Sequence, residues 1–290
     1  MARPDRVTFD PPQTLHPAVP HAGWCRVADA TTSPLGAHRH TRAYEVCLIA
    51  AGEVEWWAGD EIDVVGPGQV YLVRPGEIHG GVGEVIQPAE LYWCQLALPG
   101  PRGALGLSAA EAQDLTRRFD ELTRRVFPAD RSLEDAFARL IGGMQHAGDL
   151  APWRVRAAVL DLAASTLACH DAGVADHPEP SREIRRVTDW IEAHLHEELP
   201  IEELAALAGL AVSRFHERFA AETGYSPGDW RQRRRIAAAK RWLRTTDRPI
   251  TRIALDAGFG SSQYFATAFK RHVGVSPSAY RVSAPARPPG

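Results

Sequence analysis

A repeated pattern in the C-terminal third of the chain constrains the fold more than any other feature. The segment PIEELAALAGLAVSRFHERFAAETGYSP begins at Pro200, and PITRIALDAGFGSSQYFATAFKRHVGVSP begins at Pro249. In each segment a short apolar helix is predicted to end at a glycine, Gly209 or Gly258, and a second helix follows. Two helices joined by such a turn form the helix-turn-helix plan, in which the second helix enters the major groove of DNA.

The charge distribution is typical of a protein that contacts nucleic acid. The chain has a formal net charge of −3, but residues 212–290 carry +10 and residues 1–211 carry −13. A basic helix predicted over about residues 229–245 joins the two repeats, and it would let their second helices enter successive major grooves about 34 Å apart. Charge alone also fits a helical bundle with a solvated basic face.

The first hundred residues are predicted to be β-rich. Residues 46–50, 53–57, 70–73 and 90–98 alternate or carry strand formers, and glycine and proline separate them. Many short strands without intervening helices predict a sandwich or a barrel.

Three helices are predicted after the β-rich region, over residues 108–127, 132–147 and 152–170, because apolar residues recur there at helical spacing. Ser108 and Ser132 are candidate N-caps. These helices are expected either to close the β-domain or to pair with a second copy. The polar, proline-bearing segment AGVADHPEP at 172–180 is typical of a linker.

Membrane and secreted classes are not favoured. No apolar run approaches the roughly 18 residues that span a bilayer, and the N-terminal residues have no apolar signal region. The four cysteines, Cys25, Cys47, Cys94 and Cys169, form no CxxC pattern. We therefore expect a cytoplasmic protein with reduced thiols.

Residues 181–283 resemble the DNA-binding domain of AraC/XylS-type transcription regulators. The similarity is strongest over IALDAGFGSSQYFATAFKRHVGVSPSAYR, residues 253–281. The resemblance implies two helix-turn-helix units on one chain that bind double-stranded promoter DNA. It also implies a homodimer that acts with RNA polymerase, more commonly as an activator than as a repressor.

The resemblance places the reading helices at about residues 212–222 and 261–271. An outward-facing Arg can pair with guanine, Gln with adenine and Glu with cytosine. Base contacts are predicted for Ser213, Arg214, His216, Glu217, Ser262, Gln263 and Thr267. Phosphate contacts, which position the protein without reading sequence, are predicted for Arg218, Lys270 and Arg271. Core positions are predicted for Phe215, Phe219, Phe265 and Phe269.

The chain departs from the family pattern at the start of each reading helix. Family members often have a capping serine there, whereas this chain has Ala211 and Gly260. Alanine forgoes a cap worth about 1 kcal/mol.

In this family the N-terminal half is commonly a cupin-like β-barrel that senses a small molecule. The first cupin motif is matched by His38, His40, Glu45 and Gly52, and the second by Gly68, Pro75–Gly76 and His79. Two departures are Gly36, which lies closer to His38 than the motif's glycine, and Gly83, which replaces the usual asparagine.

His38, His40, Glu45 and His79 would form an adequate ligand set for Zn, Ni or Fe(II). His38 and His40 share a face of an extended strand, but Glu45 has the wrong parity unless the chain bends near residues 41–43. Two alternatives stay open. The histidines are structural, or they line a metal-free pocket for an effector such as a sugar. The pocket prediction adds Trp56, Arg74 and Trp93; of the adjacent Trp56 and Trp57, only one can point inward.

The sequence thus predicts a multidomain chain of α and β structure. It has a cupin-like β-barrel (1–100), a helical dimerisation segment (101–171), a linker (172–180), an all-α domain with two helix-turn-helix units (181–283) and a disordered tail (284–290). The favoured function is an effector-responsive transcription regulator. The alternative is a metal-dependent cupin enzyme with a helical appendage, but the sequence offers no second group of acid, base or nucleophile.

Overall fold

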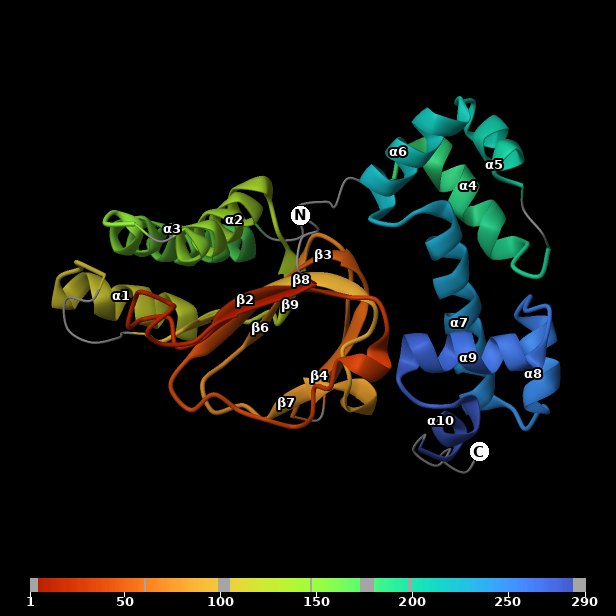
Figure 1. Ribbon diagram of the computed structural model, residues 1–290, viewed down its shortest axis with the longest axis horizontal. Coiled ribbons are helices and arrows are strands. Elements are labelled where there is room, and N and C mark those ends of the chain that lie inside the picture. The colour runs from red at the N-terminus through yellow and green to blue at the C-terminus, as the bar shows by residue number, and fades with distance from the viewer. Residues whose placement is uncertain are drawn as a thin grey trace. The chain divides into compact units, whose positions relative to one another are not determined.

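The computed structural model describes residues 5–59, 61–98, 105–146, 148–172, 180–197 and 200–283 (Figure 1). The chain divides into two units. One contains residues 1–28 and 35–177, and the other contains residues 29–34 and 178–290. The predicted linker lies mostly, and the predicted tail entirely, outside the described residues. Within the described residues, no helix combines the length and apolar character needed to cross a membrane.

Two antiparallel sheets build the first unit. The larger has the strand order β1-β2-β8-β3-β6-β9, and the smaller has the order β5-β4-β7. The strands are β1 (Arg6–Phe9), β2 (Ala22–Val27), β3 (Tyr44–Gly52), β4 (Val54–Ala58), β5 (Glu61–Val65), β6 (Gln69–Val73), β7 (His79–Gly81), β8 (Ala89–Leu96) and β9 (Val126–Pro128), with short 3₁₀ helices η1 (Ala30–Thr32) and η2 (Val82–Glu84). The four strands predicted from sequence are confirmed as β3, β4, β6 and β8.

The central strand β3 is covered on both faces, which explains its nearly continuous apolar sequence. Tyr44, Val46 and Leu48 belong to the core beneath the helices, whereas Cys47 and Ile49 belong to a second core between the sheets. Since side chains alternate along a strand, Glu45 lies on the inner face with Cys47. A carboxylate therefore points into the barrel.

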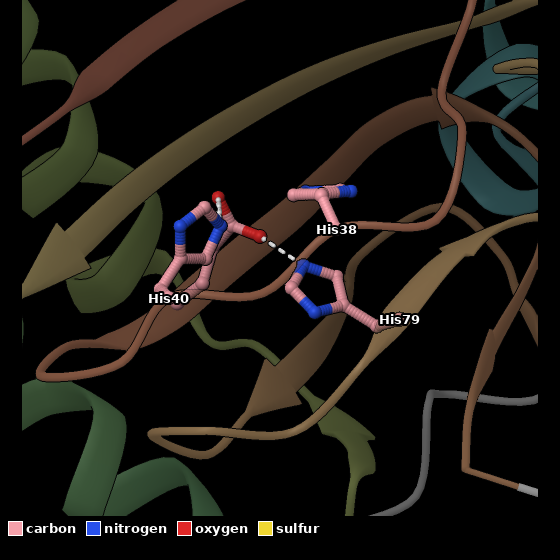
Figure 2. Close-up of side chains that lie close together, drawn as sticks. His38, His40 and His79 are labelled. Carbon is pink, nitrogen blue, oxygen red and sulfur yellow. Dashed lines mark hydrogen bonds and ion pairs between the residues drawn. The ribbon is translucent and has the colours of Figure 1, made fainter.

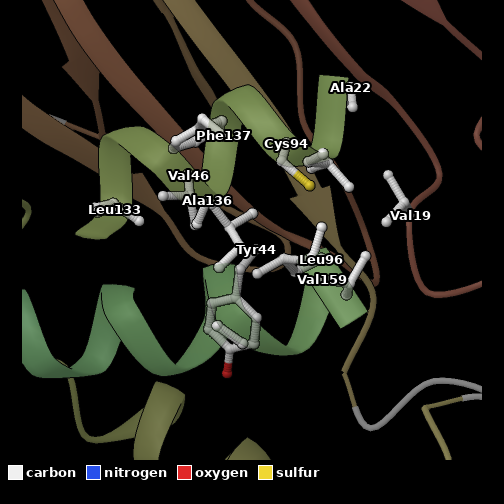
Figure 3. Close-up of a cluster of buried hydrophobic side chains, with 14 of the residues drawn as sticks. Val19, Ala22, Tyr44, Val46, Cys94, Leu96, Leu133, Ala136, Phe137 and Val159 are labelled. Carbon is white, nitrogen blue, oxygen red and sulfur yellow. The ribbon is translucent and has the colours of Figure 1, made fainter. Parts of the chain in front are cut away.

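Helices α1 (Ala109–Asp120), α2 (Arg131–Gln145) and α3 (Ala151–Asp171) complete the first unit. Figure 3 shows Leu133, Ala136 and Phe137 of α2 and Val159 of α3 against side chains of the larger sheet, and all four are fully buried. The helical segment therefore closes the outer face of the sheet, which leaves the other face for the pocket.

Three sequence predictions in this region are wrong: the end of the first helix, the end of the barrel at residue 100 and the N-cap at Ser132. The helix predicted over 108–127 ends at Asp120, and Val126–Pro128 forms β9 beside β6. Phe127 fits both patterns, because a buried aromatic residue suits a helix face and a strand, and sheet pairing decides. The barrel therefore extends beyond residue 100. The predicted Ser108 cap is confirmed, but α2 is capped by Asp130, whose carboxylate accepts from Leu133 N at 3.0 Å, not by Ser132.

The second unit is all-helical. Its helices are α4 (Arg182–Ala193), α5 (Ile201–Ala208), α6 (Val212–Thr223), α7 (Pro227–Thr245), α8 (Ile250–Asp256), α9 (Ser262–Val273) and α10 (Pro277–Ser283). One core contains residues of α4, α5 and α6, and another contains residues of α7, α8 and α9. Each core encloses two of the four predicted phenylalanines, all 0% exposed. The two predicted helix-turn-helix units are confirmed.

The turns of the two helix-turn-helix units depend on glycine. Gly209 and Gly258 have φ angles of +69° and +84°, in the left-handed region that suits a residue without a side chain. Gly224 and Gly274 end the second helices with φ angles of +74° and +86°. The sequence repeat is therefore also a repeat of backbone geometry.

Candidate functional site

Figure 2 shows His38, His40 and His79 close together inside the barrel, and the carboxylate of Glu45 lies within the same cluster. His38 and His79 exchange two backbone hydrogen bonds of 3.0 Å, which bring the segment after Gly36 beside β7. The chain then bends at residues 41–42 before β3 begins, as the parity of Glu45 required. One ligand atom from each of His38, His40, Glu45 and His79 lies within 4.8 Å of the other three.

Two backbone carbonyl groups orient the histidine rings. Nδ1 of His38 lies 2.8 Å from the carbonyl oxygen of Gly36, and Nδ1 of His79 lies 3.1 Å from that of Glu77. A ring held in this way through Nδ1–H presents Nε2 to the centre of the cluster. Metal-binding histidines in proteins are usually held by the same kind of hydrogen bond.

Glu45 is the acidic centre of the cluster. Its carboxylate oxygens lie 3.5 Å from Nε2 of His40 and 3.2 Å from Nε2 of His79. Burial disfavours the charged carboxylate, but the hydrogen bonds with His40 and His79 outweigh burial and hold the pKa of Glu45 well below its usual range. Burial also lowers the pKa of His38, which favours the neutral imidazole that a metal ion requires.

The donor set fits a divalent metal ion. Ligand atoms bound to one zinc ion at about 2.0–2.2 Å lie at most about 4 Å apart. The observed spread of 4.8 Å requires only a small closing movement. Three imidazoles and one carboxylate also suit Ni or Fe(II).

A cavity of about 220 Å³ contains the cluster. Drug-sized ligands occupy about 300–1,000 Å³, so this cavity suits a smaller molecule. Trp56 and Trp93 line it as predicted. Trp56 is 5% exposed, whereas its neighbour Trp57 donates Nε1–H to the carbonyl of Gly81 outside the lining, so only one of the pair faces inward.

The prediction that Arg74 lines the pocket is wrong. Its guanidinium donates to the Leu122 carbonyl at 2.6 Å and pairs with Glu77 at 3.4 Å. Sequence proximity to His79 suggested a pocket position, but residues 74–79 form a turn that directs Arg74 towards the segment between α1 and β9.

Gln95 is a pocket residue that the sequence prediction missed. Its side-chain amide nitrogen lies 3.1 Å from both ring nitrogens of His40 and 3.5 Å from Glu45 Oε1. Gln95 stands two residues after Trp93 on β8 and opposite Glu45 on β3. The period of two along a strand could have identified it.

The two reading helices expose the residues predicted to contact bases. These are Ser213, Arg214, His216 and Glu217 on α6, and Ser262, Gln263 and Thr267 on α9. The opposite face of each helix carries its two buried phenylalanines. Each helix therefore has one face fixed by packing and one polar face available to DNA.

The predicted phosphate contacts differ in their surroundings. Lys270 and Arg271 are exposed in the last turn of α9. Arg218 instead lies 2.6 Å from Glu222 and 3.3 Å from Glu183, so a phosphate would have to compete with two carboxylates for it.

The predicted lack of a side-chain cap is confirmed for one reading helix and wrong for the other. Ala211 precedes α6 without a capping hydrogen bond. The N-cap of α9 is Ser261, not Gly260, and its hydroxyl accepts from Tyr264 N at 3.1 Å. One more residue in the second turn moves the N-cap position to Ser261.

Two family models match the chain. An AraC-like ligand binding domain matches residues 21–163, and a helix-turn-helix domain matches residues 204–283. The HTH-type transcriptional activator RhaS of Mannheimia succiniciproducens is 32% identical over 113 residues, which are 39% of this chain and 41% of that protein. The MmsAB operon regulatory protein of Pseudomonas aeruginosa is 28% identical over 220 residues, 75% of this chain and 66% of that protein.

Among solved structures, the DNA-binding domain of AdpA in complex with a target DNA is 36% identical, covers 36% of this chain and 93% of that chain, and has a TM-score of 0.34. The matched regions span only 38–54% of the length of the first three curated relatives. The two family models nevertheless fall on the barrel with its helices and on the repeated helical unit. The chain therefore belongs to the AraC family of transcription regulators, with an AraC-like ligand-binding domain followed by a helix-turn-helix domain.

Proposed function

We propose that the protein is a transcription activator that binds promoter DNA through α6 and α9 and responds to a small effector bound in the barrel. The observation that carries this proposal is the pair of helices with exposed polar faces and buried phenylalanine faces. Helix α7, which has 19 residues, joins the two helix-turn-helix units and is roughly 28 Å long at 1.5 Å per residue. That length is close to the spacing of successive major grooves, about 34 Å.

The cavity supports a small effector with oxygen donors, such as a sugar. Trp56 and Trp93 offer aromatic faces to its apolar side, and Gln95 with the histidine cluster offers polar groups to its oxygens. A few placed polar groups in a largely apolar lining are typical of a ligand pocket.

The cluster itself supports one divalent metal ion, zinc, nickel or iron, as part of the effector site. His38, His40, Glu45 and His79 would hold the ion. When bound, the ion supplies positive charge that attracts an oxygen donor of the effector. The chain's own residues orient that effector: Gln95 holds His40, the carbonyls of Gly36 and Glu77 hold the other two rings, and the tryptophans exclude water.

We also propose a homodimer formed through the helical segment, which acts with RNA polymerase in the cytoplasm. Trp153 and Leu150 at the start of α3 support the dimer, since they are 65% and 62% exposed although large and apolar. Trp153→Glu should shift the full chain from dimer to monomer in analytical ultracentrifugation. A monomeric wild-type chain would contradict this part of the proposal.

The alternative of a metal-dependent enzyme has weaker support. Glu45 is the one carboxylate among the described residues that line the cavity, and two histidines already hold it. The relatives are named as transcription regulators. The described lining also contains Cys47 and Tyr71, but burial raises the pKa of both groups, which disfavours the thiolate as a nucleophile and the phenolate as a base and so supports binding more than catalysis.

The test is a fluorescence anisotropy titration of the full chain with DNA from upstream of its own coding region, compared with a scrambled duplex. We expect specific binding at least about 10³-fold tighter than non-specific binding, with an affinity that falls steeply with salt. Glu134→Gln on α2 is a control that should change nothing. Equal affinity for both duplexes would overturn the proposal.

The metal is tested by elemental analysis after incubation with zinc, nickel and iron(II). We expect about one ion per wild-type chain and none in His38→Ala/His40→Ala. Equal metal content in the two proteins would contradict the metal site but would leave a metal-free effector pocket.

A further inference from the structure

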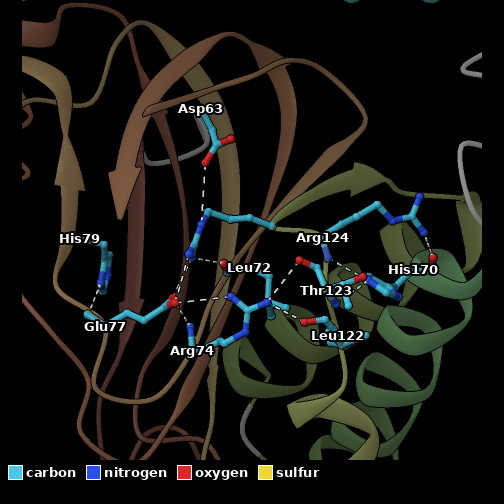
Figure 4. Close-up of polar contacts among 10 residues, drawn as sticks. Asp63, Leu72, Arg74, Glu77, His79, Leu122, Thr123, Arg124 and His170 are labelled. Atoms are coloured by element: carbon cyan, nitrogen blue, oxygen red, sulfur yellow. Dashed lines mark hydrogen bonds and ion pairs between the residues drawn. The ribbon is translucent and has the colours of Figure 1, made fainter. Parts of the chain in front are cut away.

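A continuous set of polar contacts joins the histidine cluster to the C-terminal end of α3 (Figure 4). It begins at His79, passes through Glu77 to two arginines, and reaches His170 through the segment between α1 and β9. His170 is the penultimate residue of α3, after which the chain continues through residues 173–179 towards α4. Each link consists of specific contacts within the unit that contains the barrel and helices α1 to α3.

The first link connects the cluster to the turn that follows β6. The ring of His79 meets the cluster through Nε2, and its Nδ1 lies 3.1 Å from the Glu77 carbonyl oxygen. A ligand or ion that engages Nε2 fixes the orientation of the ring. The ring in turn fixes the carbonyl of Glu77, and hence the turn at residues 74–79.

The second link is the carboxylate of Glu77. It accepts two hydrogen bonds from the Arg125 guanidinium, at 2.7 and 3.0 Å, and one from Arg74 N at 2.9 Å. Burial would raise the pKa of Glu77, but these contacts outweigh it and lower the pKa to about 2. Arg125 also lies over the ring of Tyr71, which lines the cavity, so it has a second connection to the pocket.

The third link holds the segment Glu121–Arg125 from both sides. Arg74 donates to the carbonyl of Leu122 at 2.6 Å. From the other side, Nε2 of His170 accepts hydrogen bonds from the backbone N–H groups of Thr123 and Arg124, at 3.1 and 3.2 Å. The guanidinium of Arg124 also donates to the His170 carbonyl. The segment lies between helix and strand, and these side-chain contacts add to the backbone hydrogen bonds that hold its two ends, from Glu121 to Arg117 and from Leu72 to Arg125.

We propose that occupation of the histidine cluster is transmitted through Glu77 and Arg125 to the end of α3, where the chain leaves the sensor unit. This inference rests on the proposed function, because it describes how the same pocket is coupled to DNA binding. Coupling requires an element whose position both ends can bias. The segment Glu121–Arg125 is that element, because Arg74 and Glu77 contact it on the pocket side and His170 contacts it on the α3 side.

The test is hydrogen exchange on the full chain, with zinc ions as the probe and a chelator as the reference, and calorimetry on the same samples. On adding zinc, we expect exchange at the amides of Thr123 and Arg124, and in the last turn of α3, to slow by about fivefold or more, the lower end of typical coupling between sites. Glu77→Gln should bind zinc with similar affinity but lose this change. Glu134→Gln is the matched control and should keep it.

Each contrary result has a distinct meaning. If zinc binds but exchange at these amides does not change, the route is overturned and the metal site stands. If Glu77→Gln transmits as well as wild type does, the signal does not pass through Glu77 and the inference fails. If calorimetry shows no zinc binding, the metal proposal fails. The route is then decided without metal by comparing exchange at Thr123 and Arg124 in wild type and His79→Asn, where unchanged exchange would overturn it.

A second variant covers the case in which Glu77→Gln does not fold. His170→Phe keeps an aromatic ring against Phe127, which the His170 ring contacts at 5.4 Å between centroids, but removes the acceptor for the two amides. We expect it to bind zinc normally and to lose the zinc-dependent change in the last turn of α3. A change as large as that of wild type would contradict the inference.

Discussion

In the first helix-turn-helix unit, the N-cap residue of reading helix α6 is Ala211, which offers no side-chain cap. In the second, the N-cap residue of α9 is Ser261, whose hydroxyl accepts a hydrogen bond from Tyr264 N. The exposed faces differ as well. Among the residues predicted to contact bases, α6 exposes charged side chains, Arg214 and Glu217, whereas those of α9 are neutral, such as Gln263 and Thr267. The buried phenylalanines and the glycine turns are the same in both. Packing is thus the same in the two helix-turn-helix units, while the residues predicted to contact bases carry different chemistry.

The largest loss of stability is expected in the phenylalanine cores, where the two helix-turn-helix units are alike. Phe219→Ala and Phe269→Ala each empty a fully buried site and should lower the free energy of unfolding by about 3–5 kcal/mol. Chemical denaturation followed by circular dichroism would measure the loss. A much smaller loss for one of them would show that its core is looser than its partner's.

Replacing the turn glycines should destabilise the two helix-turn-helix units by different amounts. Gly209→Ala places a Cβ in open space and should cost roughly 1–2 kcal/mol for the left-handed backbone alone. In Gly258→Ala the Cβ would also lie 2.2 Å from the Leu195 carbonyl oxygen, which adds a further cost of roughly 1–3 kcal/mol. Thermal unfolding of both variants measures the difference, and equal losses would contradict this close approach.

DNA binding should distinguish the two surfaces. Arg214→Ala and Gln263→Ala should each weaken binding to the cognate site by about 1–3 kcal/mol and relax the preference at different base pairs. Lys270→Ala should weaken binding to all sequences and reduce the salt slope by about 1. Arg218→Ala should have less effect than Lys270→Ala, because Glu183 and Glu222 already pair with Arg218. Titrations against a panel of single-base variants test all four substitutions.

Changing either N-cap residue to match the other should reduce the difference in stability between the two helix-turn-helix units. Ala211→Ser should add about 1 kcal/mol to the free energy of unfolding, and Ser261→Ala should remove about 1 kcal/mol. Melting temperatures of the single variants check both signs. A destabilised Ala211→Ser would mean that the turn before α6 cannot place a serine hydroxyl near the helix amides.

As the pH falls, the second helix-turn-helix unit should lose stability before the first. His272 and Glu222 occupy equivalent positions in the repeat. Burial lowers the pKa of His272 in the folded chain, so the unfolded chain takes up a proton first and the free energy of unfolding falls as the pH drops below the ordinary value of about 6.5. Burial opposes ionisation of Glu222, but hydrogen bonds with Ser181 and Arg218 lower its pKa, so its contribution is lost only below about 4.5. His272→Gln should flatten the pH dependence of thermal unfolding between about pH 7 and 5, while Glu222→Gln should leave that range unchanged.

The sequence by itself determined the features that depend on local pattern. The repeat predicted both helix-turn-helix units, and the resemblance to the cupin motifs implied that His38, His40, Glu45 and His79 meet. Helical periodicity separated Phe215 and Phe269 in the cores from the polar faces of their helices. These features follow from periods of two and 3.6 residues, which are written into the order of the residues.

Tertiary structure alone decided the features that depend on which segments pair. The strand β9 lies inside a predicted helix because its pairing with β6 overrides local preference. Arg74 leaves the pocket because the segment after α1 offers it a carbonyl, and Gln95 enters the pocket because β8 pairs with β3. The contacts from His79 to His170 span three separate parts of the sequence. Each depends on long-range contacts, which neighbouring residues do not specify.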